Sequence, residues 1–392
     1  MSSTLRLGKI AGIEVGIHYS LFLVLLFFSW SLARDFLPGL NASWSTPTYW
    51  AVGFLAALLL FVSVLVHELA HSVVARASGI EVGGITLFLL GGVSNLKAEA
   101  KGPRDEFVIS AVGPAASLAL AGLLFLAYRV IGGEAAPATP FGVVTVPLSV
   151  VEAVLLYLWF INLVLGIFNL LPAFPLDGGR TLRAIIWAVT GNLSSATKVA
   201  AGSGQAMGIL LILLGVWQVL QGNLVGGLWF ALIGMFLNRS ASTARREMKV
   251  QTSLRGFGVK DAMRLDPPTI DPDASVSSAV YGPLVQQGTL AVLVCEKGSL
   301  VGIISLSDIK GVPQHRWALA TVRECMTRTP LWTLKPDDEL AHGLEMLGEH
   351  SINQAPVLEE GRLVGLLSKA DIAQFMRLNS KLDFRGGRFG LG

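Results

Sequence analysis

Long apolar runs without charged residues dominate the first 240 residues of the chain. Five stretches contain no Asp, Glu, Lys or Arg: Val15–Ala33, Trp50–Val66, Phe107–Tyr128, Ala153–Leu176 and Val199–Asn238. The last is twice the length that one span needs, and Gln221-Gly222-Asn223 divides it. About 20 helical residues, rising 1.5 Å each, cross a hydrocarbon core of about 30 Å. The pattern therefore predicts an all-α membrane bundle of six transmembrane helices.

A shorter glycine-punctuated segment, residues 83–96, lies between the second and third of these spans. It is too short to cross a membrane, and its glycines favour a strand pair, so we expect a membrane-associated β segment. Irregular backbone at membrane depth occurs only where protein or a water-filled cavity satisfies its polar groups. The segment thus indicates a cavity nearby.

The distribution of basic residues predicts the orientation. With the N-terminus in the cytoplasm, thirteen Lys and Arg residues of the membrane part lie in cytoplasmic segments, whereas only Arg34 and Arg129 lie outside. Cytoplasmic loops of membrane proteins are enriched in Lys and Arg. We expect a multi-pass protein of the plasma or inner cell membrane with both termini in the cytoplasm.

The composition changes after residue 250. Charged residues number 31 in residues 251–392, against 26 in the first 250. Two segments there, Val259–Lys310 and Val322–Gln374, repeat one pattern that ends in a strand and a turn. A repeat of this length containing helices and strands predicts two α/β modules packed together. We therefore divide the chain into a membrane domain (1–240), a linker (241–258), two modules (259–312 and 322–378) and a flexible tail (379–392).

Charge and cysteine content argue against a nucleic-acid-binding protein and against a disulfide-rich or cysteine–zinc protein. The net charge is +3 and the chain has no long basic run, so no nucleic-acid partner is expected. The two cysteines, Cys295 and Cys325, are too few for a disulfide framework or a cysteine zinc cluster. They fit a reducing compartment for the second half of the chain.

The strongest chemical signal is His67-Glu68-Leu69-Ala70-His71, at the end of the second apolar stretch. Histidines at i and i+4 share one helix face and can bind one divalent metal, with the glutamate beside them as a base. Histidines at a membrane edge are the plainer interpretation. Burying these groups in an apolar span without a partner is costly, however, which favours a metal site.

A third ligand is needed, because hydrolytic zinc sites usually have three protein ligands. Asp177 is the candidate, since Pro172 and Pro175 end the fourth span and Gly178-Gly179 allow the chain to turn back toward the bundle. Asp177 is otherwise a turn residue, a common role for an Asp-Gly-Gly sequence. The incomplete two-histidine site favours the ligand role.

These motifs resemble the site-2 protease family of intramembrane zinc metalloproteases. The resemblance covers about residues 10–240 and rests on the His67 to His71 motif, on Asn169-x-x-Pro172-x-x-x-Leu176-Asp177-Gly178-Gly179 and on Gly113-Pro114-Ala115-Ala116-Ser117. It implies that His67, His71 and Asp177 hold one zinc ion and that Glu68 is the general base and acid. The substrates it implies are transmembrane segments of membrane-anchored proteins within the lipid bilayer.

Two further roles concern the transition state and the substrate. Asn169 is the candidate donor to the oxyanion, although a helix-packing role is equally open; for Asn162 the packing role is preferred. An unwound substrate can add as a strand to the 83–96 segment, which makes Leu87, Leu89 and Asn95 candidate substrate-binding residues. The competing role for this segment is a structural plug.

The two cytoplasmic modules resemble a tandem pair of cystathionine-β-synthase-type (CBS) domains. Each carries Gly-x-x-Ser-x-x-Asp: Gly302, Ser305 and Asp308 in the first, and Gly365, Ser368 and Asp371 in the second. By itself such a serine and acid pair is a helix capping box. The resemblance implies an adenine nucleotide (ATP, ADP or AMP) at these residues, and a homodimer formed through the pair.

The sequence therefore predicts an intramembrane zinc protease with a cytoplasmic regulatory pair. The alternative is a transporter or channel regulated by CBS domains and lacking peptidase activity. A transporter should place ionisable groups along a path through the bilayer. Here the ionisable groups cluster at one depth, which favours the protease.

Overall fold

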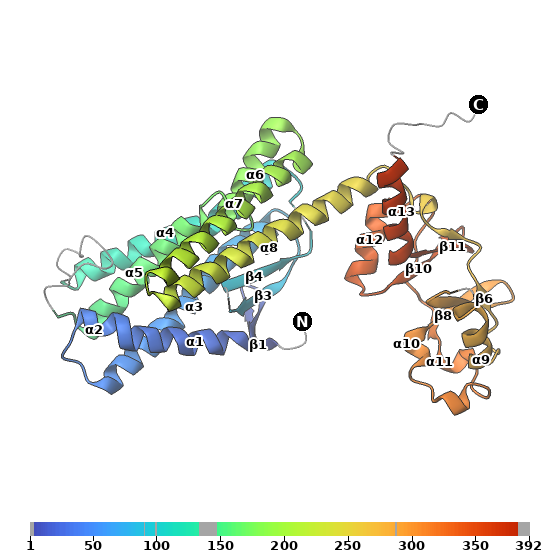
Figure 1. Ribbon diagram of the computed structural model, residues 1–392, viewed down its shortest axis with the longest axis horizontal. Helices are drawn as coiled ribbons and strands as arrows, with labels where there is room; N and C mark the ends of the chain where they lie inside the picture. Colours follow the sequence, from blue (N-terminus) through green and yellow to red (C-terminus); the bar gives the residue numbers. More distant parts are fainter. Residues whose placement is uncertain (1–3, 90, 99, 133–146, 287, 383–392) are drawn as a thin grey trace. The chain divides into compact units, whose positions relative to one another are not determined.

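The computed structural model describes residues 4–89, 91–98, 100–132, 147–286 and 288–382. By its internal contacts the chain divides into two units, one ending at Arg246 and the other beginning at Glu247. The first unit is a helical bundle with a small sheet at one end of α1 (Figure 1). The second is a mixed α/β unit.

Six helical segments of the described residues are long and apolar enough to span a membrane, which confirms the predicted number. They are Ser20–Leu40 (α1, Ser20–Ser31; a π-helical turn, Leu32–Phe36; and α2, Leu37–Leu40), α3 (Thr46–Ala77), α4 (Pro103–Val130), α5 (Val150–Asn169), α7 (Leu193–Leu220) and α8 (Leu224–Leu254). Gln221, Gly222 and Asn223 separate α7 from α8, as expected.

Helix α3 lies at the centre of the bundle and contacts α1, α4 and α5. Its buried side chains are mostly small or aliphatic, such as Ala56, Ala57 and Leu60, and they belong to the main apolar core of the unit. Close packing of this kind is expected where helices associate within lipid. The histidine motif lies on the same helix, which continues to Ala77, so it is held in a rigid element rather than at a frayed end.

The beginning of the first apolar stretch is a strand rather than part of a helix. β1 (Thr4–Ile10) and β2 (Ile13–His18) form an antiparallel hairpin, and α1 begins only at Ser20. The prediction of one continuous span from Val15 was wrong because β2 finds a parallel partner in β3 (Val82–Phe88), which lies far away in the sequence. Apolar runs do not distinguish buried strands from helix ends.

The glycine-punctuated segment is the expected strand pair. β3 and β4 (Gly91–Leu96) pair antiparallel, and the sheet order is β1-β2-β3-β4. β3 is therefore an inner strand and β4 is an edge strand. β4 also contacts α3, so the sheet edge lies next to the histidine motif.

A short helix not predicted from sequence, α6 (Asp177–Thr190), follows the proline-containing turn after α5. It lies between α4 and α7 and contacts both. Its charged residues prevented it from appearing as an apolar run. Asp177 occupies its first turn, where a carboxylate interacts favourably with the helix dipole.

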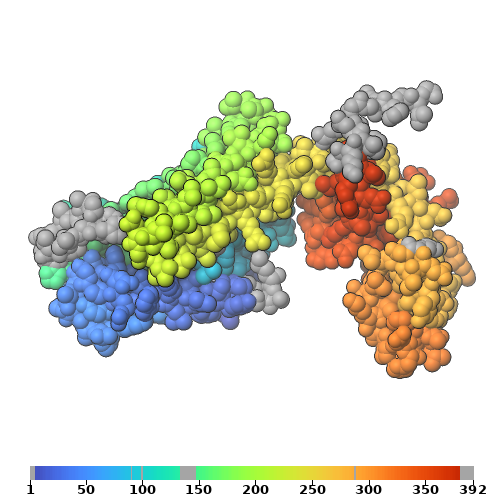
Figure 2. Space-filling view, viewed as in Figure 1, coloured from blue at the N-terminus to red at the C-terminus, as the bar shows by residue number. Residues whose placement is uncertain are grey.

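Helices α7 and α8 lie against each other in the first unit (Figure 2). A Cβ added at Gly208 would lie 2.7 Å from the Gly234 carbonyl oxygen, and one added at Gly215 would lie 2.6 Å from the Gly227 carbonyl oxygen. Only glycine permits so close an approach, a common device between membrane helices.

The second unit contains the two repeats with interlocking sheets. One sheet has the order β6-β7-β8-β9 and the other β10-β11-β5, so that β5, which precedes the first repeat's core, pairs with the second repeat's β11. The strands are β5 (Arg264–Leu265), β6 (Thr269–Ile270), β7 (Ala291–Glu296), β8 (Ser299–Ser305), β9 (Thr327–Arg328), β10 (Gln354–Glu359) and β11 (Arg362–Ser368). The helices are α9 (Val276–Ala279), α10 (Leu306–Ile309), α11 (Val322–Cys325), α12 (Leu340–Glu349) and α13 (Lys369–Leu382).

Helix α8 continues through most of the segment expected to be a linker. Its last residue, Leu254, is fully buried in the apolar core of the second repeat together with Val259 and Leu347. The end of this helix is thus part of the second unit rather than a free connection.

Candidate metal centre

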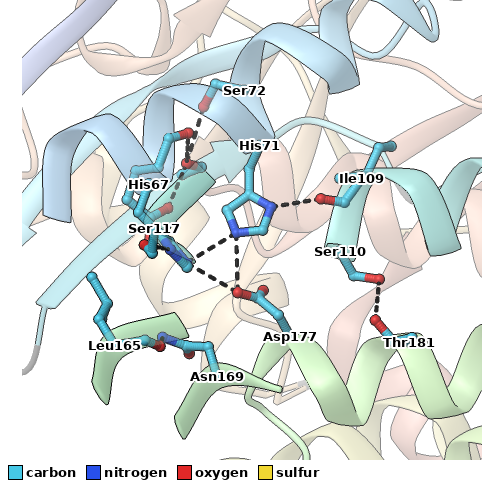
Figure 3. A network of polar contacts seen from close by, with 12 residues as sticks. His67, His71, Ser72, Ile109, Ser110, Ser117, Leu165, Asn169, Asp177 and Thr181 are labelled. Atoms are coloured by element: carbon cyan, nitrogen blue, oxygen red, sulfur yellow. Dashed lines mark hydrogen bonds and ion pairs between the residues drawn. The ribbon is translucent and has the colours of Figure 1, made fainter. Parts of the chain in front are cut away.

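Three side chains from two distant segments converge in the first unit (Figure 3). Asp177 Oδ2 lies 3.0 Å from His67 Nε2 and 3.1 Å from His71 Nε2, and the two Nε2 atoms lie 3.2 Å apart. Both histidines are buried, and the Asp177 side chain is 13% exposed. The structure therefore brings together the three residues that the sequence proposed as ligands.

Helix α4 contacts both imidazole rings at Nδ1, the ring nitrogen that does not face Asp177. His67 Nδ1 lies 2.9 Å from Ser117 Oγ, and His71 Nδ1 lies 2.6 Å from the Ile109 carbonyl oxygen. A partner on the second ring nitrogen fixes the tautomer of a metal-binding histidine and its orientation. Both Nε2 atoms consequently point toward Asp177.

The chemistry of this donor set calls for a cation. A carbonyl oxygen only accepts, so His71 Nδ1 carries the hydrogen and donates to Ile109. In the neutral ring Nε2 then offers a lone pair toward the Asp177 carboxylate, which also offers only lone pairs. A shared divalent metal satisfies both of these groups at once, and His67 Nε2 lies within reach of the same ion.

The spacing also fits zinc. Ligand atoms about 2.0 to 2.1 Å from a tetrahedral zinc ion lie roughly 3.3 Å from one another. The observed separations of 3.0, 3.1 and 3.2 Å approach this value. Three protein ligands leave one position open, as in hydrolytic rather than structural zinc sites.

Gly113 leaves room beside the histidines. A Cβ at this position would lie 2.1 Å from His71 Nε2 and 2.8 Å from His67 Nε2. The residue therefore has to be glycine for both nitrogens to keep their positions. Gly113 and Ser117 belong to a motif that the sequence singled out only for its resemblance, and their i and i+4 spacing was the available clue.

The approach of Asp177 depends on the two glycines that follow it. A Cβ at Gly178 would lie 2.2 Å from the Leu170 carbonyl oxygen, and one at Gly179 would lie 2.2 Å from the Phe174 backbone nitrogen. The start of α6 thus packs directly on the turn that ends α5. This close packing returns the carboxylate to the histidines.

Glu68 is held by the edge strand. Its Oε2 accepts a hydrogen bond from Ser94 Oγ at 2.8 Å, and Ser72 Oγ donates to Ser94 Oγ at 3.0 Å. Gly92 makes room for it, because a Cβ there would lie 2.4 Å from Glu68 Cγ. The sequence carried no signal for Ser94, whose position depends on strand pairing.

The two asparagines have different surroundings. Asn162 is fully buried and donates to Ser63 Oγ at 3.0 Å, which joins α5 to α3. Asn169, the last residue of α5, donates through Nδ2 to the Leu165 carbonyl oxygen at 2.9 Å (Figure 3). A carboxamide carries two N–H hydrogens, so this contact leaves one donor of Asn169 for another partner.

The proposed substrate residues are not equivalent. Leu87 is 4% exposed, belongs to the main core, and pairs with Ile17 on one side and Gly92 on the other. Its backbone therefore offers no free strand edge, and its role in substrate binding stays a prediction. Leu89 is half-buried and donates its backbone N–H to Ser20 Oγ, whereas Asn95 is exposed on β4.

In the second unit the two serine and aspartate pairs form capping interactions. Asp308 Oδ2 accepts from Ser305 Oγ at 2.6 Å, and Asp371 Oδ2 accepts from Ser368 Oγ at 2.5 Å. Ser305 and Asp308 also line a cleft of about 490 Å³ between the repeats, together with Trp332. Neither Ser368 nor Asp371 lines this cleft.

Comparisons with known proteins agree with both units. The family model described as Peptidase family M50 matches residues 55–214, and the CBS domain model matches residues 259–314 and 322–378. The chain is 35% identical over 381 residues to the protein Rip3 of Mycobacterium tuberculosis, covering 96% of this chain and 93% of that one.

Two further matches, one to a sequence and one to a solved structure, are from Methanocaldococcus jannaschii. One is described as zinc metalloprotease MJ0392, with 31% identity over 96% of this chain and 97% of its own length. The other is a solved structure described as a site-2 protease, with 30% identity and a TM-score of 0.42, covering 62% of this chain and 95% of that one.

Proposed function

Because the chain belongs to peptidase family M50, the site-2 protease family, and carries a tandem CBS pair, we propose that it cleaves transmembrane segments of membrane-anchored proteins. One observation carries the proposal: His67, His71 and Asp177 converge beside Glu68 within a six-span bundle. Neither a transporter path nor a structural zinc site accounts for an acid placed next to a three-ligand centre.

His67, His71 and Asp177 would hold the metal, and the second ring nitrogens of both histidines keep them in position. When bound, zinc supplies a Lewis acid that polarises a peptide carbonyl and lowers the pKa of water. The ligands come from α3 and α6. Contacts with α4, and the close backbone contacts at the glycines described above, keep their separations fixed.

Glu68 moves the proton. Ser94 donates to Oε2, which fixes the carboxylate and leaves Oε1 to take a proton from the attacking water. The same oxygen then returns the proton to the leaving amide nitrogen. General acid and base groups of this kind contribute about 10²- to 10⁴-fold to rates.

Asn169 is our candidate for stabilising the oxyanion. Its Nδ2 atom has one hydrogen directed to Leu165 and a second hydrogen to offer a substrate oxygen. A single oxyanion donor is worth about 10²- to 10³-fold in turnover. A role in capping α5 alone is the competing interpretation, since the bond to Leu165 lies within the helix.

Substrate capture is assigned to β4 rather than β3. A transmembrane helix must unwind before its peptide bonds can be attacked, and an unwound segment can pair with an exposed strand edge. Among the described residues β4 pairs with β3 on one side only, and its Ser94 and Gly92 touch Glu68. A substrate strand added there would pass next to the proton-transfer group.

For the second unit we propose an adenine nucleotide in the cleft near Asp308. This cleft has Trp332, 57% exposed and stacked on His350 with 3.6 Å between ring centroids, as a surface for a planar base. At the second motif Arg264 Nη2 lies 3.5 Å from Asp371 Oδ1. That carboxylate already has a cationic partner, whereas the Asp308 carboxylate faces the neutral Thr327.

The remaining proposals concern the orientation of the chain in the membrane and its oligomeric state. We propose that both termini lie in the cytoplasm, because basic residues concentrate on that side of the spans. Dimerisation through the CBS pair is proposed from the family resemblance.

The test of the protease proposal uses the full chain in detergent or vesicles. Glu68→Gln should retain one zinc ion per chain while cleavage of a model transmembrane substrate falls by at least about 10²-fold. Zinc content and product formation are measured on the same preparation. Unchanged cleavage by this variant, or a wild-type chain that binds no zinc, would contradict the proposal.

A further inference from the structure

We propose that the buried ion pair of Glu106 and Arg183 is a positioning element that holds Asp177 within reach of the two histidines. The inference rests on the metal centre proposed above and extends it to residues that neither bind metal nor touch substrate. It assigns a role to two charged groups within the membrane unit that the reaction itself does not use.

The pair is buried in the first unit. Glu106 on α4 is 1% exposed and Arg183 on α6 is 8% exposed. Arg183 Nε donates to Glu106 Oε1 at 2.6 Å, and Nη2 contacts the same oxygen. Buried charges in membrane proteins are expensive, and those that persist commonly have a functional reason.

Stability alone is a poor explanation for this pair. Glu106 Oε2 is buried and has no hydrogen-bond partner among the described residues. A buried ion pair with an unsatisfied oxygen recovers little of its desolvation cost, and apolar replacements of such pairs are often neutral or stabilising. The pair therefore needs a reason other than the free energy of folding.

The geometry supplies that reason. Asp177 is the first residue of α6, and Arg183 lies six residues further on, about 9 Å along the helix. A second contact joins the same helices, with Ser110 Oγ 2.9 Å from Thr181 Oγ1. Since α6 is rigid, fixing Thr181 and Arg183 against α4 also fixes Asp177.

Helix α4 is thereby a common reference for all three proposed ligands. The carbonyl oxygen of Ile109 holds His71, and Ser117 holds His67. Glu106 lies on the same helix, one turn before Ser110. The ion pair thus positions Asp177 relative to the helix that also positions the histidines.

Arg183 also contacts the chain on the other side of Asp177. Its guanidinium carbon lies 5.6 Å from the centre of the Phe174 ring, a cation–π contact. Phe174 belongs to the turn that precedes α6. The planar guanidinium therefore links this turn to Glu106, and a lysine ammonium cannot reproduce both contacts.

The experiment compares stability with metal affinity. Arg183→Lys keeps the charge but loses the Nε hydrogen bond, and Glu106→Leu/Arg183→Leu removes both buried charges together. The full chain is purified in detergent, stripped with chelator and titrated with zinc alone, and cobalt absorption reports the ligand geometry. Thermal unfolding of the metal-free proteins reports stability.

We expect the zinc dissociation constant to rise about 10- to 100-fold in both variants, with a changed cobalt spectrum, because partners of metal ligands have effects of this size. The metal-free double variant should unfold near the wild-type temperature. Asn162→Leu, which removes a buried polar contact between α5 and α3, is the control: it should leave zinc affinity within about twofold of the wild type.

If Arg183→Lys, or a stable double variant, binds zinc as tightly as the wild type does, the inference is overturned. The ion pair then has only a structural role. If the double variant does not fold, Arg183→Lys decides alone. Absence of zinc binding by the wild-type chain overturns the protease proposal instead, so the two failures are distinguishable.

Discussion

At the scale of single residues, the candidate site depends on small or neutral groups whose spatial roles a sequence does not reveal. Gly113 clears the space that His71 Nε2 occupies, and Ser94 holds the Glu68 carboxylate. The Ile109 backbone carbonyl sets the tautomer of His71. These groups determine how the conspicuous histidines and acids point, which is what a metal responds to.

Replacing Gly113 tests this dependence. Gly113→Ala places a methyl group 2.1 Å from the present position of His71 Nε2, so the ring or the helix has to move. We expect zinc affinity to fall about 10- to 100-fold and cleavage to fall with it. Equilibrium zinc titration measures the effect.

The matched control is Gly122→Ala on the same helix, where an added Cβ meets no atom of the described part of the chain within 4 Å. It should bind zinc and cleave substrate as the wild type does. Equal zinc affinity for the two alanine variants would refute the spatial role of Gly113.

At the scale of elements, α6 and β4 bring separate parts of the chain to the centre. α6 is short, is not a candidate span, and places Asp177 at its first residue. α7 supports the preceding turn, because Gly204 lies against the Phe174 carbonyl oxygen. β4 gives the site a strand edge beside Glu68 that no other described strand pairs with. Each of these elements supports the site through a close approach of its backbone at a glycine rather than through a long side chain.

Gly204→Ala tests the support from α7. The new Cβ would lie 1.9 Å from the Phe174 carbonyl oxygen, which forces the turn before Asp177 to shift. We expect a stability loss of about 1 to 3 kcal/mol from overpacking, and weaker zinc binding. At Gly202 on the same helix an added Cβ meets no described atom within 4 Å, so Gly202→Ala should change neither property. Thermal unfolding and zinc titration of both variants would settle the comparison.

The edge-strand proposal predicts a loss of cleavage without loss of metal. Val93 is 51% exposed on β4, and Val93→Pro fixes the backbone and removes one main-chain N–H of this strand. We expect cleavage of a transmembrane substrate to fall at least about tenfold, since strand addition depends on main-chain hydrogen bonds. Zinc content should be unchanged.

Val93→Thr keeps a β-branched side chain and the N–H, and should retain activity. A fully active proline variant would argue against capture by β4. Proline at Leu87 is a less informative test, because that residue is buried and paired on both sides.

At the scale of the whole molecule, the chain joins a membrane protease unit to a CBS pair through one continuous helix. α8 begins within the spans, and its last residue, Leu254, is buried in the core of the second repeat. Coupling between a nucleotide site and the proposed active site would have to involve this helix. A nucleotide can change cleavage only if it binds two conformational states of the protein with different affinities.

The nucleotide proposal predicts unequal effects of the two motifs. Asp308→Ala should abolish binding of ATP, ADP and AMP to the full chain, because Asp308 lines the cleft. Asp371→Ala should retain binding within a few-fold, because that carboxylate faces Arg264 instead. Calorimetric titration measures both variants. Equal loss in the two variants, or no nucleotide binding by the wild type, would contradict the assignment.

The sequence by itself determined what depends on local composition. Apolar run length gave the six spans, since crossing a hydrocarbon layer requires a minimum number of apolar residues. The i, i+4 histidines shared a helix face, and the repeat after residue 250 indicated two α/β modules. These features need no knowledge of distant partners.

Only the tertiary structure decided what depends on contacts between distant segments. Val15–His18 is a strand because β3 pairs with it, and β4 rather than β3 is the free edge because of the order of the sheet. The separation of Asp177 from the histidines is set by α6 packing on α4 and on the turn after α5. Such placements follow from backbone approach and buried polar pairing between residues 70 or more positions apart, which no local pattern of side chains encodes.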